Sequence, residues 1–185
     1  MRAFALLTLA LAAGAAVACA QDTPGAITNS WDSVVDLISN KGDTTEIWQA
    51  VQEADLADAL DELTNITATV FIPWDAVFDA DAAANLTTTE LVEVLKYHVV
   101  PGQALTLDEL TDGQVLQTLV EGPAGQLRVI VSPNAQKPIL ETSSGEQVPI
   151  YQFNLGAGPD TIVHTIRGLL VPGGETLDAA APAAV

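Results

Sequence analysis

The sequence predicts an α+β fold, with helices in the first part of the chain and a mostly antiparallel sheet in the second. Apolar residues before residue 114 recur mainly every three or four positions, which is the period of amphipathic helices. From Gln114 the period changes to two, which is typical of strands. One β-branched and aromatic run, residues 69–72, lies within the helical part and is expected to be a buried strand.

Residues 1–20 have the features of a secretory signal peptide. One basic residue precedes an apolar run, and the small residues Ala18-Cys-Ala20 then mark a cleavage site before Gln21. The apolar run is too short to span a bilayer. A lipoprotein signal with lipid on Cys19 is the alternative, but Ala16 stands where leucine is usual, which favours plain secretion.

The chain that remains after cleavage is strongly acidic. It carries five Lys and Arg against 24 Asp and Glu, a net charge of −19, because the signal holds Arg2 and no acidic residue. Such a surface repels phosphate backbones and anionic lipid heads, so binding to nucleic acid or acidic membranes is not expected. Cys19 is the only cysteine, so the mature domain has no disulfide and depends on a buried core, for which roughly 150 residues are enough.

Three helices are expected before the central strand. The first has an apolar face over residues 31–38 that begins with Trp31. The second opens with Asp43-Thr-Thr-Glu46, a capping box in which Asp43 would cap the helix. The third turns the apolar residues of 56–63 inward and acidic residues outward. These carboxylates lack the spacing of a calcium loop and indicate a solvated face.

The central strand leads directly into a helical turn. Pro73 ends the strand because proline has no N–H for a sheet ladder. Asp75 then stands where a helix N-cap would, with residues 76–78 as the first turn. Two further capping patterns, Thr87-Thr-Thr-Glu90 and Thr106-Leu-Asp-Glu109, predict a helix and another helical turn.

Four strands are expected in the second part of the chain: residues 115–120, 127–132, 148–155 and 161–166. Residues 173–185 are rich in Ala, Gly and Pro and are predicted to form a flexible tail. This tail lacks the hydrophobic end of a glycolipid-anchor signal, so we expect release from the cell rather than anchoring, and no transmembrane anchor after signal cleavage.

Three motifs resemble those of the fasciclin-type domain family, which includes fasciclin-like and periostin-like domains. Thr69-Val-Phe-Ile-Pro-Trp-Asp-Ala-Val-Phe78 is similar to the first family motif, and Leu95-Lys-Tyr-His-Val-Val-Pro-Gly102 is similar to its Tyr-His signature. Asp160-Thr-Ile-Val-His-Thr-Ile-Arg-Gly-Leu-Leu-Val-Pro172 resembles the second motif. The matching positions are Thr69, Phe71, Pro73, Asp75, Phe78, Tyr97, His98, Pro101, Gly102, His164 and Pro172. Their order and spacing make the resemblance specific.

This resemblance implies a compact wedge, a small β-sandwich with helices packed around it, found in secreted and cell-surface proteins. The domain plan is a signal peptide (1–20), a lead-in (21–27), a fasciclin-type domain (28–172) and the tail (173–185). The chain departs from the motifs at Trp74, where a small polar residue is common, at Pro159-Asp160 in place of Asn-Gly, and at Arg167 in place of Asp. Integrin-type adhesion in animal relatives uses residues near the second motif. This sequence has no matching Asp-Ile there, so that activity is not carried over.

The two histidines are expected to be core residues rather than ligands. His164 alternates with Ile162 and Ile166 along a strand, and His98 ends an apolar helix. Their ring nitrogens would then bond to backbone or carboxylate groups. The alternative, a metal site or an acid–base pair, lacks further ligands at suitable spacing. Because a Gly-x-Ser-x-Gly elbow, a mature cysteine nucleophile and a phosphate-binding loop are also missing, we expect neither an enzyme nor a cofactor.

Two sequons, Asn65-Ile-Thr67 and Asn85-Leu-Thr87, lie beside predicted element ends. Behind a signal peptide they are expected to be glycosylated if the source is eukaryotic. Trp31, Trp48 and Trp74 are expected to pack in the core or at its rim.

Two classes of function remain. The resemblance favours a secreted, non-catalytic adhesion module of the extracellular matrix or cell wall, which binds extracellular proteins or glycans. The alternative is a water-soluble carrier of a hydrophobic small molecule such as a carotenoid, similar to some fasciclin-type proteins of green algae. The carrier would need an exposed apolar groove, to which Trp31, Trp48 or Trp74 contributes, and the acidic shell would keep the complex in solution. Adhesion is placed first because it is the commoner role in the family.

Overall fold

The computed structural model describes residues 27–53, 55, 57–62, 66–77, 87–131 and 137–173, and it has the predicted α+β fold. The helices are α1 (Val34–Asn40), α2 (Thr45–Glu53), α3 (Ala57–Glu62) and α5 (Thr88–Tyr97), with 3-10 turns η2 (Asp75–Val77), η3 (Leu107–Glu109) and η4 (Pro123–Gly125). The strands are β1 (Thr28–Trp31), β2 (Ala68–Pro73), β3 (Val99–Pro101), β4 (Val115–Gln117), β5 (Gln126–Ile130), β6 (Ile139–Thr142), β7 (Gln147–Ala157) and β8 (Thr161–Ile166). The predicted signal peptide, the tail after residue 173, Phe78 and both sequon asparagines lie outside the described residues.

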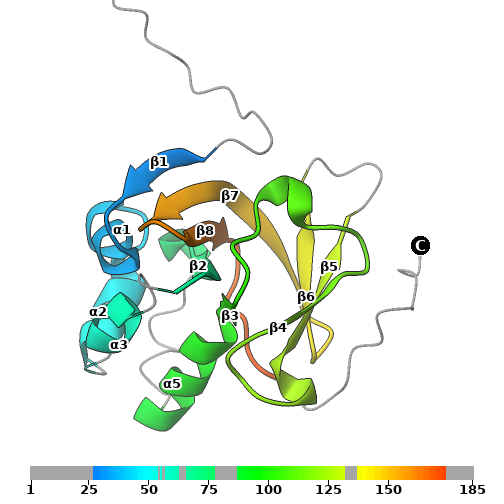
Figure 1. The fold of residues 1–185 in the computed structure, drawn as a ribbon. Coiled ribbons are helices and arrows are strands. Elements are labelled where there is room, and N and C mark those ends of the chain that lie inside the picture. Colours follow the sequence, from blue (N-terminus) through cyan, green and yellow to red (C-terminus); the bar gives the residue numbers. More distant parts are fainter. Residues whose placement is uncertain are drawn as a thin grey trace, which may run out of the picture.

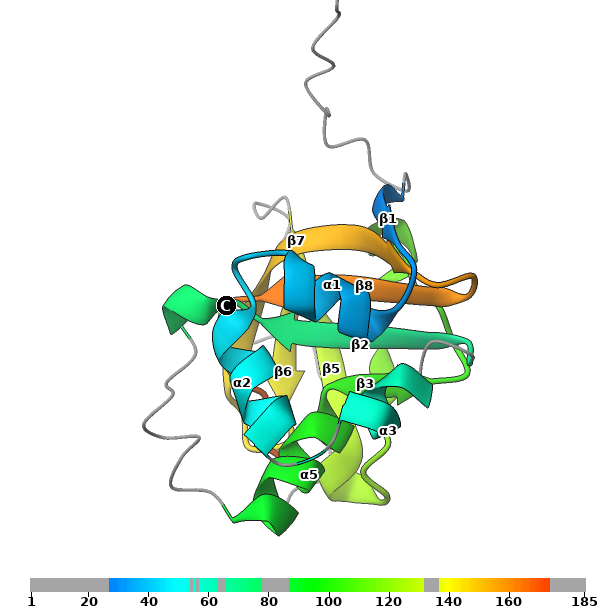
Figure 2. The same ribbon diagram turned by 90° about the vertical axis from the view of Figure 1, so that its left-hand side faces the viewer.

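The elements form layers. Helices α1, α2 and α3 cover one face of β2 and β8, and β4, β5 and β6 lie on the opposite side (Figures 1 and 2). The strand order is β3-β2-β8-β7-β6-β5-β4, and β1 pairs with β7 outside this path. The described strands pair mostly in antiparallel fashion, as expected, but β2 pairs with β8, and β1 with β7, in parallel.

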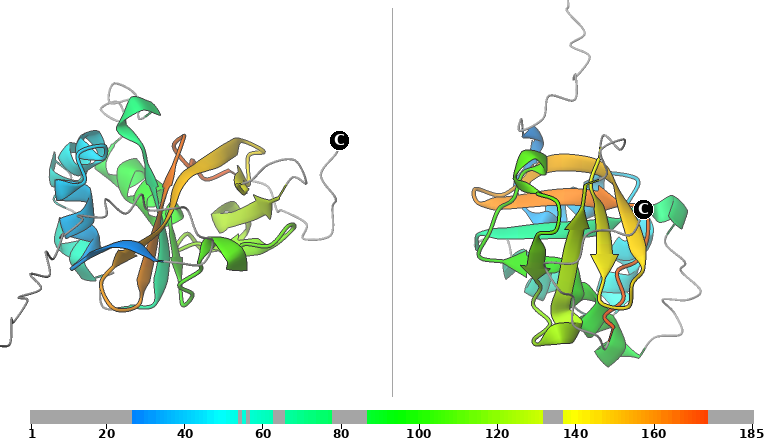
Figure 3. Two further views of the ribbon diagram at one scale, coloured as in Figure 1. Left: turned by 90° about the horizontal axis from the view of Figure 1, so that it is seen from above. Right: turned by 90° about the vertical axis from the view of Figure 1, so that its right-hand side faces the viewer.

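Strand β7 belongs to both halves of the sheet and bends between them. Its first residues pair with β6 and its later residues with β8, and the register shifts on both sides of Gln152. Asn154, beyond the first shift, has a φ of 56°. Such irregularities bend a strand, so the two halves of the sheet can enclose a common core, as the expected sandwich requires (Figure 3).

Strands β2 and β8 separate two hydrophobic clusters, and all six residues of each strand are buried. Val70, Ile72 and Val163 face the cluster under the helices, which also contains Leu37 and Val51. The cluster on the other side fills the sandwich, with Phe71 and Ile166 from the two central strands. The alternation of side chains along each strand therefore supplies both cores at once.

The spacing of apolar residues predicted Trp31 as the first residue of a helix, and this prediction is wrong. Trp31 ends β1, and α1 begins at Val34 after Ser33, whose hydroxyl accepts the Asp36 N–H at 2.9 Å as an N-cap. Pairing of β1 with β7 overrides the local helical pattern, because Trp31 lies opposite Ala157 in that ladder. The helical cluster still includes Trp31 at its edge.

The prediction that Asp43 caps α2 is wrong, because Asp75 is the acceptor. The Asp75 carboxylate accepts the N–H groups of Thr45 at 2.8 Å and Glu46 at 3.0 Å, and the Thr45 hydroxyl at 2.6 Å. Asp43 instead pairs with Lys41, and its carbonyl accepts the Asp75 N–H at 2.9 Å. The end of β2 thus supplies both the negative charge and the acceptor that a helix N-terminus needs. Asp75 itself is the first residue of η2 rather than its cap.

The other two capping patterns agree with the structure. Thr87 and Glu90 form a complete capping box on α5, and the Glu109 carboxylate accepts both the N–H and the hydroxyl of Thr106 at 2.8 Å. Strands β4 and β5 end earlier than expected, and β1, β3 and β6 were not predicted as strands. Each of these three is only three or four residues long, too short to show a clear period.

We expect Asp75→Ala to lower the free energy of unfolding by about 1–2 kcal/mol, because it removes the acceptor for three donors at the start of α2. Asp61→Ala, an exposed position with the same change of charge, should stay within about 0.5 kcal/mol of the parent chain. Urea denaturation at neutral pH measures both values. Equal stability of the two variants would contradict the assigned cap.

Candidate functional site

His98 is a fully enclosed link between α5 and the end of the domain. Its Nδ1 lies 2.7 Å from the Val94 carbonyl, and its Nε2 accepts the Leu170 N–H at 3.1 Å. This pattern places the ring proton on Nδ1, because Nε2 serves as an acceptor. Burial lowers the pKa of His98 to about 4, so the ring is neutral at physiological pH.

His164 has a similar environment within β8. Its Nε2 lies 2.8 Å from the Leu105 carbonyl, the Asn154 N–H points to Nδ1 at 3.4 Å, and the ring stacks on Phe71 with centroids 5.7 Å apart. Burial lowers its pKa to about 4 as well. Both histidines are therefore core residues bonded to the backbone, as predicted.

Other residues of the family motifs also bind backbone groups. The Tyr97 hydroxyl donates to the Gln126 carbonyl at 2.7 Å and accepts the Ser143 N–H at 3.0 Å, and burial raises its pKa. The Thr69 hydroxyl donates to the Gln103 carbonyl and accepts the Leu105 N–H. These polar side chains hold loops against the sheet. Because their hydroxyl groups are hydrogen-bonded to the backbone, their role is structural.

The turn after β3 needs the Pro-Gly of the Tyr-His signature. Pro101 is the last residue of β3, and Gly102 has a φ of 78°, a conformation that favours glycine. The Gly102 N–H donates to the Thr67 carbonyl at 2.7 Å, which fixes the turn beside β2. Pro172, at the other end of the matched region, is half-buried and lies two residues after the strand-facing Leu170.

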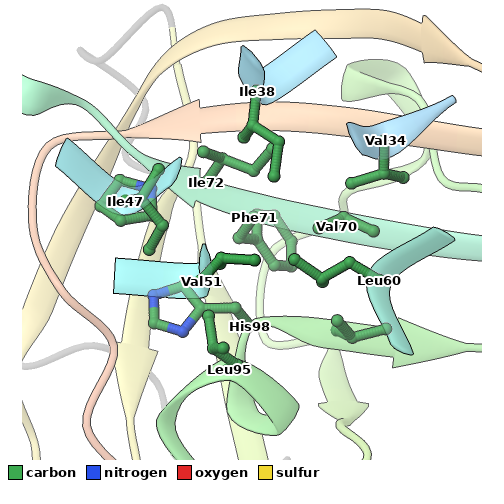
Figure 4. Close-up of a pocket in the computed structure, with 12 residues that line it drawn as sticks. Val34, Ile38, Ile47, Val51, Leu60, Val70, Phe71, Ile72, Leu95 and His98 are labelled. Carbon is green, nitrogen blue, oxygen red and sulfur yellow. The ribbon is translucent and has the colours of Figure 1, made fainter. Parts of the chain in front are cut away.

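A small apolar cavity lies between the helices and β2. Side chains from α1, α2 and α3 point toward Val70 and Ile72, with Leu95 and His98 at the lower edge (Figure 4). Its volume of about 20 Å³ is close to the space of one water molecule. Trp31 and Trp48 pack against the surrounding helical cluster but do not line the cavity.

Trp74 differs from the other two tryptophans because it belongs to a surface cluster. Its ring stacks on Tyr151 with centroids 4.8 Å apart and an interplanar angle of 23°. The Arg167 guanidinium carbon lies 4.5 Å from the Tyr151 centroid and 5.4 Å from the Trp74 centroid. Arg167 is exposed and both rings are half-buried. We refer to these three residues as the aromatic–arginine cluster.

The sheet register assembles this cluster. Strands β2 and β8 run in parallel with Pro73 opposite Ile166, so the residues that follow them, Trp74 and Arg167, leave the sheet at the same edge. The Trp74 N–H donates to the Ile166 carbonyl at 3.0 Å, and Tyr151 comes from the neighbouring β7. Trp74 and Arg167 are two of the departures from the family motifs. The two departures from the motifs could have indicated this site in the sequence, but only the parallel register of β2 and β8 shows that Trp74 and Arg167 lie together.

A second cation extends the cluster along β7. The Lys137 ammonium lies 4.9 Å from the Phe153 centroid and 6.0 Å from that of Tyr151, and it donates to the Tyr151 carbonyl at 2.7 Å. Within the described part of the chain, the ion pairs are Lys41 with Asp43 and Arg128 with Glu141. Neither Lys137 nor Arg167 takes part in them, so both cations lie beside the rings without an ion-pair partner among the described residues.

The described residues contain no group of three or more His, Cys, Asp or Glu side chains that could hold a metal ion. Over the same residues, no helix combines the length and the apolar character that crossing a membrane demands.

Comparison with known proteins agrees with this architecture. The sequence model of the fasciclin domain matches residues 42–172. Among solved structures, the chain is similar to one described as "Novel Fold Revealed by the Structure of a FAS1 Domain Pair from the Insect Cell Adhesion Molecule Fasciclin I", with a TM-score of 0.59 and 15% identity. The match covers 77% of this chain and 51% of that one, so this chain spans about half the length of the insect chain. A search of curated proteins found no match.

The free energy of unfolding should fall as the pH is lowered from about 6.5 to about 4. The histidine pKa is about 4 in the folded protein and 6.5 as the ordinary value, so the unfolded chain binds more protons in this window. Above pH 6.5 both states are neutral at these rings and the stability is fully present. Each ring is expected to contribute on the order of 1–3 kcal/mol to the fall.

Urea denaturation between pH 7 and pH 5 tests this dependence. Glu90 and Glu109, whose pKa values are lowered by hydrogen bonds from Thr87 and Thr106, lose their contribution only below their ordinary pKa of 4.5. They are therefore separated from the histidines. His164→Gln should reduce the slope, and a midpoint that stays constant from pH 7 to pH 5 in the parent chain would contradict the assignment.

Proposed function

This chain belongs to the fasciclin domain family, a family of adhesion-related domains of extracellular and cell-surface proteins, and we propose that it is a secreted, non-catalytic adhesion module. Its partners are extracellular proteins or glycans of a matrix or cell wall. The observation that carries this proposal is the aromatic–arginine cluster, which presents two fixed rings and an exposed cation at one sheet edge. Tryptophan, tyrosine and arginine are the side chains most enriched where protein interfaces gain their affinity.

The rest of the described domain supports a binding role rather than catalysis. The side chains best suited to proton transfer, His98, His164 and Tyr97, are buried and bonded to backbone groups. Strands β2 and β8, which lead to the cluster, are buried along their whole length. The cluster therefore stands on a rigid support, which reduces the entropy that binding would otherwise cost.

Bead adhesion tests the proposal. Beads coated with the full chain should be retained on immobilised extracellular polysaccharide or protein fractions better than beads coated with the heat-unfolded chain. Arg167→Gln should reduce retention, whereas Lys96→Gln, an exposed cation on α5 with the same change of charge, should leave it unchanged. Retention no higher than that of uncoated beads on every fraction would overturn the adhesion role.

Carriage of a hydrophobic small molecule such as a carotenoid is the second candidate, and the apolar lining of the cavity under α1–α3 favours it. At about 20 Å³ the cavity admits no carotenoid ring, so loading would require the helical layer to move away from β2. The absorption spectrum of protein purified from its source without detergent tests this candidate. A visible band that co-elutes with the protein would support it, and a colourless protein that takes up no added carotenoid would exclude it.

A further inference from the structure

We propose that the aromatic–arginine cluster binds a saccharide that carries a carboxylate, a uronic-acid residue. Arg167 would hold the carboxylate, and the exposed surface of the stacked Trp74–Tyr151 pair would contact the sugar ring. This inference rests on the proposed adhesion function, because it names the partner of the same surface.

The cation of the cluster is placed to receive a carboxylate. The Arg167 guanidinium carbon lies 4.5 Å and 5.4 Å from the centroids of two rings, and such cation–π contacts restrict where the guanidinium can lie. The residue is exposed, and the ion pairs of the described chain do not include it. A guanidinium offers two parallel N–H donors that match the two oxygens of one carboxylate.

The rings give the site its shape. Trp74 and Tyr151 are stacked at 4.8 Å and half-buried, so each keeps part of its surface open while its position is fixed by packing. The apolar C–H face of a pyranose packs well on such a surface, and few rotamers have to be frozen when it binds. A ring with one attached carboxylate therefore matches the stacked pair and the guanidinium together.

The charge of the whole chain limits what can approach this edge. A formal net charge of −18 repels a polymer with closely spaced negative groups, such as nucleic acid or a heavily sulfated chain. Arg167 and Lys137 make the edge itself unfavourable for a cationic partner. A short saccharide that carries uronic-acid residues satisfies both conditions, because it brings only a few negative charges to the acidic surface and Arg167 can neutralise one of them locally.

Isothermal titration calorimetry of the full chain tests the proposal with trigalacturonate as the probe and its fully methyl-esterified form as the matched control. The acid form should bind and the ester should bind about tenfold more weakly or not at all, because esterification removes the charge but keeps the sugar rings. Equal binding of the two forms would overturn the role of Arg167. No binding of trigalacturonate at millimolar concentration would overturn the site.

Variants locate the contact. Arg167→Gln and Trp74→Leu should each weaken trigalacturonate binding about tenfold, and Arg167→Lys should weaken it less than Arg167→Gln because the charge remains without the planar fork. Lys96→Gln, with the same loss of charge on α5 and outside the cluster, should bind as the parent chain does. Circular dichroism confirms folding of each variant, and the comparison of acid and ester on the parent chain stands even if Trp74→Leu does not fold.

Bead adhesion, measured on the same preparation, separates the two proposals. Retention of coated beads without trigalacturonate binding would overturn the uronate site and leave the adhesion role intact. The absence of both would overturn both. Retention that soluble trigalacturonate competes away, but its methyl ester does not, is the result expected if the uronate site carries the adhesion.

Discussion

The parallel pairing of β2 with β8 is the constraint on which the rest of the structure depends. It runs from Ala68 opposite Thr161 to Pro73 opposite Ile166 and forms a wall buried on both faces. One face of the wall supports the helices and the other closes the sandwich core. Because parallel strands end at the same edge, the pairing also brings Trp74 to Arg167. The fold and the candidate site thus have a common origin.

Features fixed by neighbouring residues could be predicted from the sequence. The capping box from Thr87 to Glu90 depends on contacts within a few positions, and the β-branched pattern of residues 161–166 can be recognised without its partners; both the box and the strand are present. The errors concern partners that are distant in the chain. Trp31 lies in a strand because β7 pairs with it. The cap of α2 comes from Asp75, which is 30 residues away from Thr45 in the sequence.

The candidate site shows the same division. The burial of His98 and His164 followed from their apolar surroundings in the sequence, since a polar group in such a pattern must find backbone partners. The tryptophans could not be told apart in this way. Two of them pack at the helical cluster, whereas Trp74 stacks on Tyr151 at the surface, and that difference depends on a register between strands that no local pattern encodes.

The position of β2 in the sheet also matters while the chain is being made. β2 lies between β3, which follows soon after it, and β8, which begins only at Thr161. As the polypeptide emerges from the ribosome, one edge of this strand, which is fully buried in the folded domain, therefore stays open until nearly the whole domain has been synthesised. An open apolar edge pairs readily with other chains. This edge is consequently the part of the nascent domain most exposed to association with other chains until the last strand arrives.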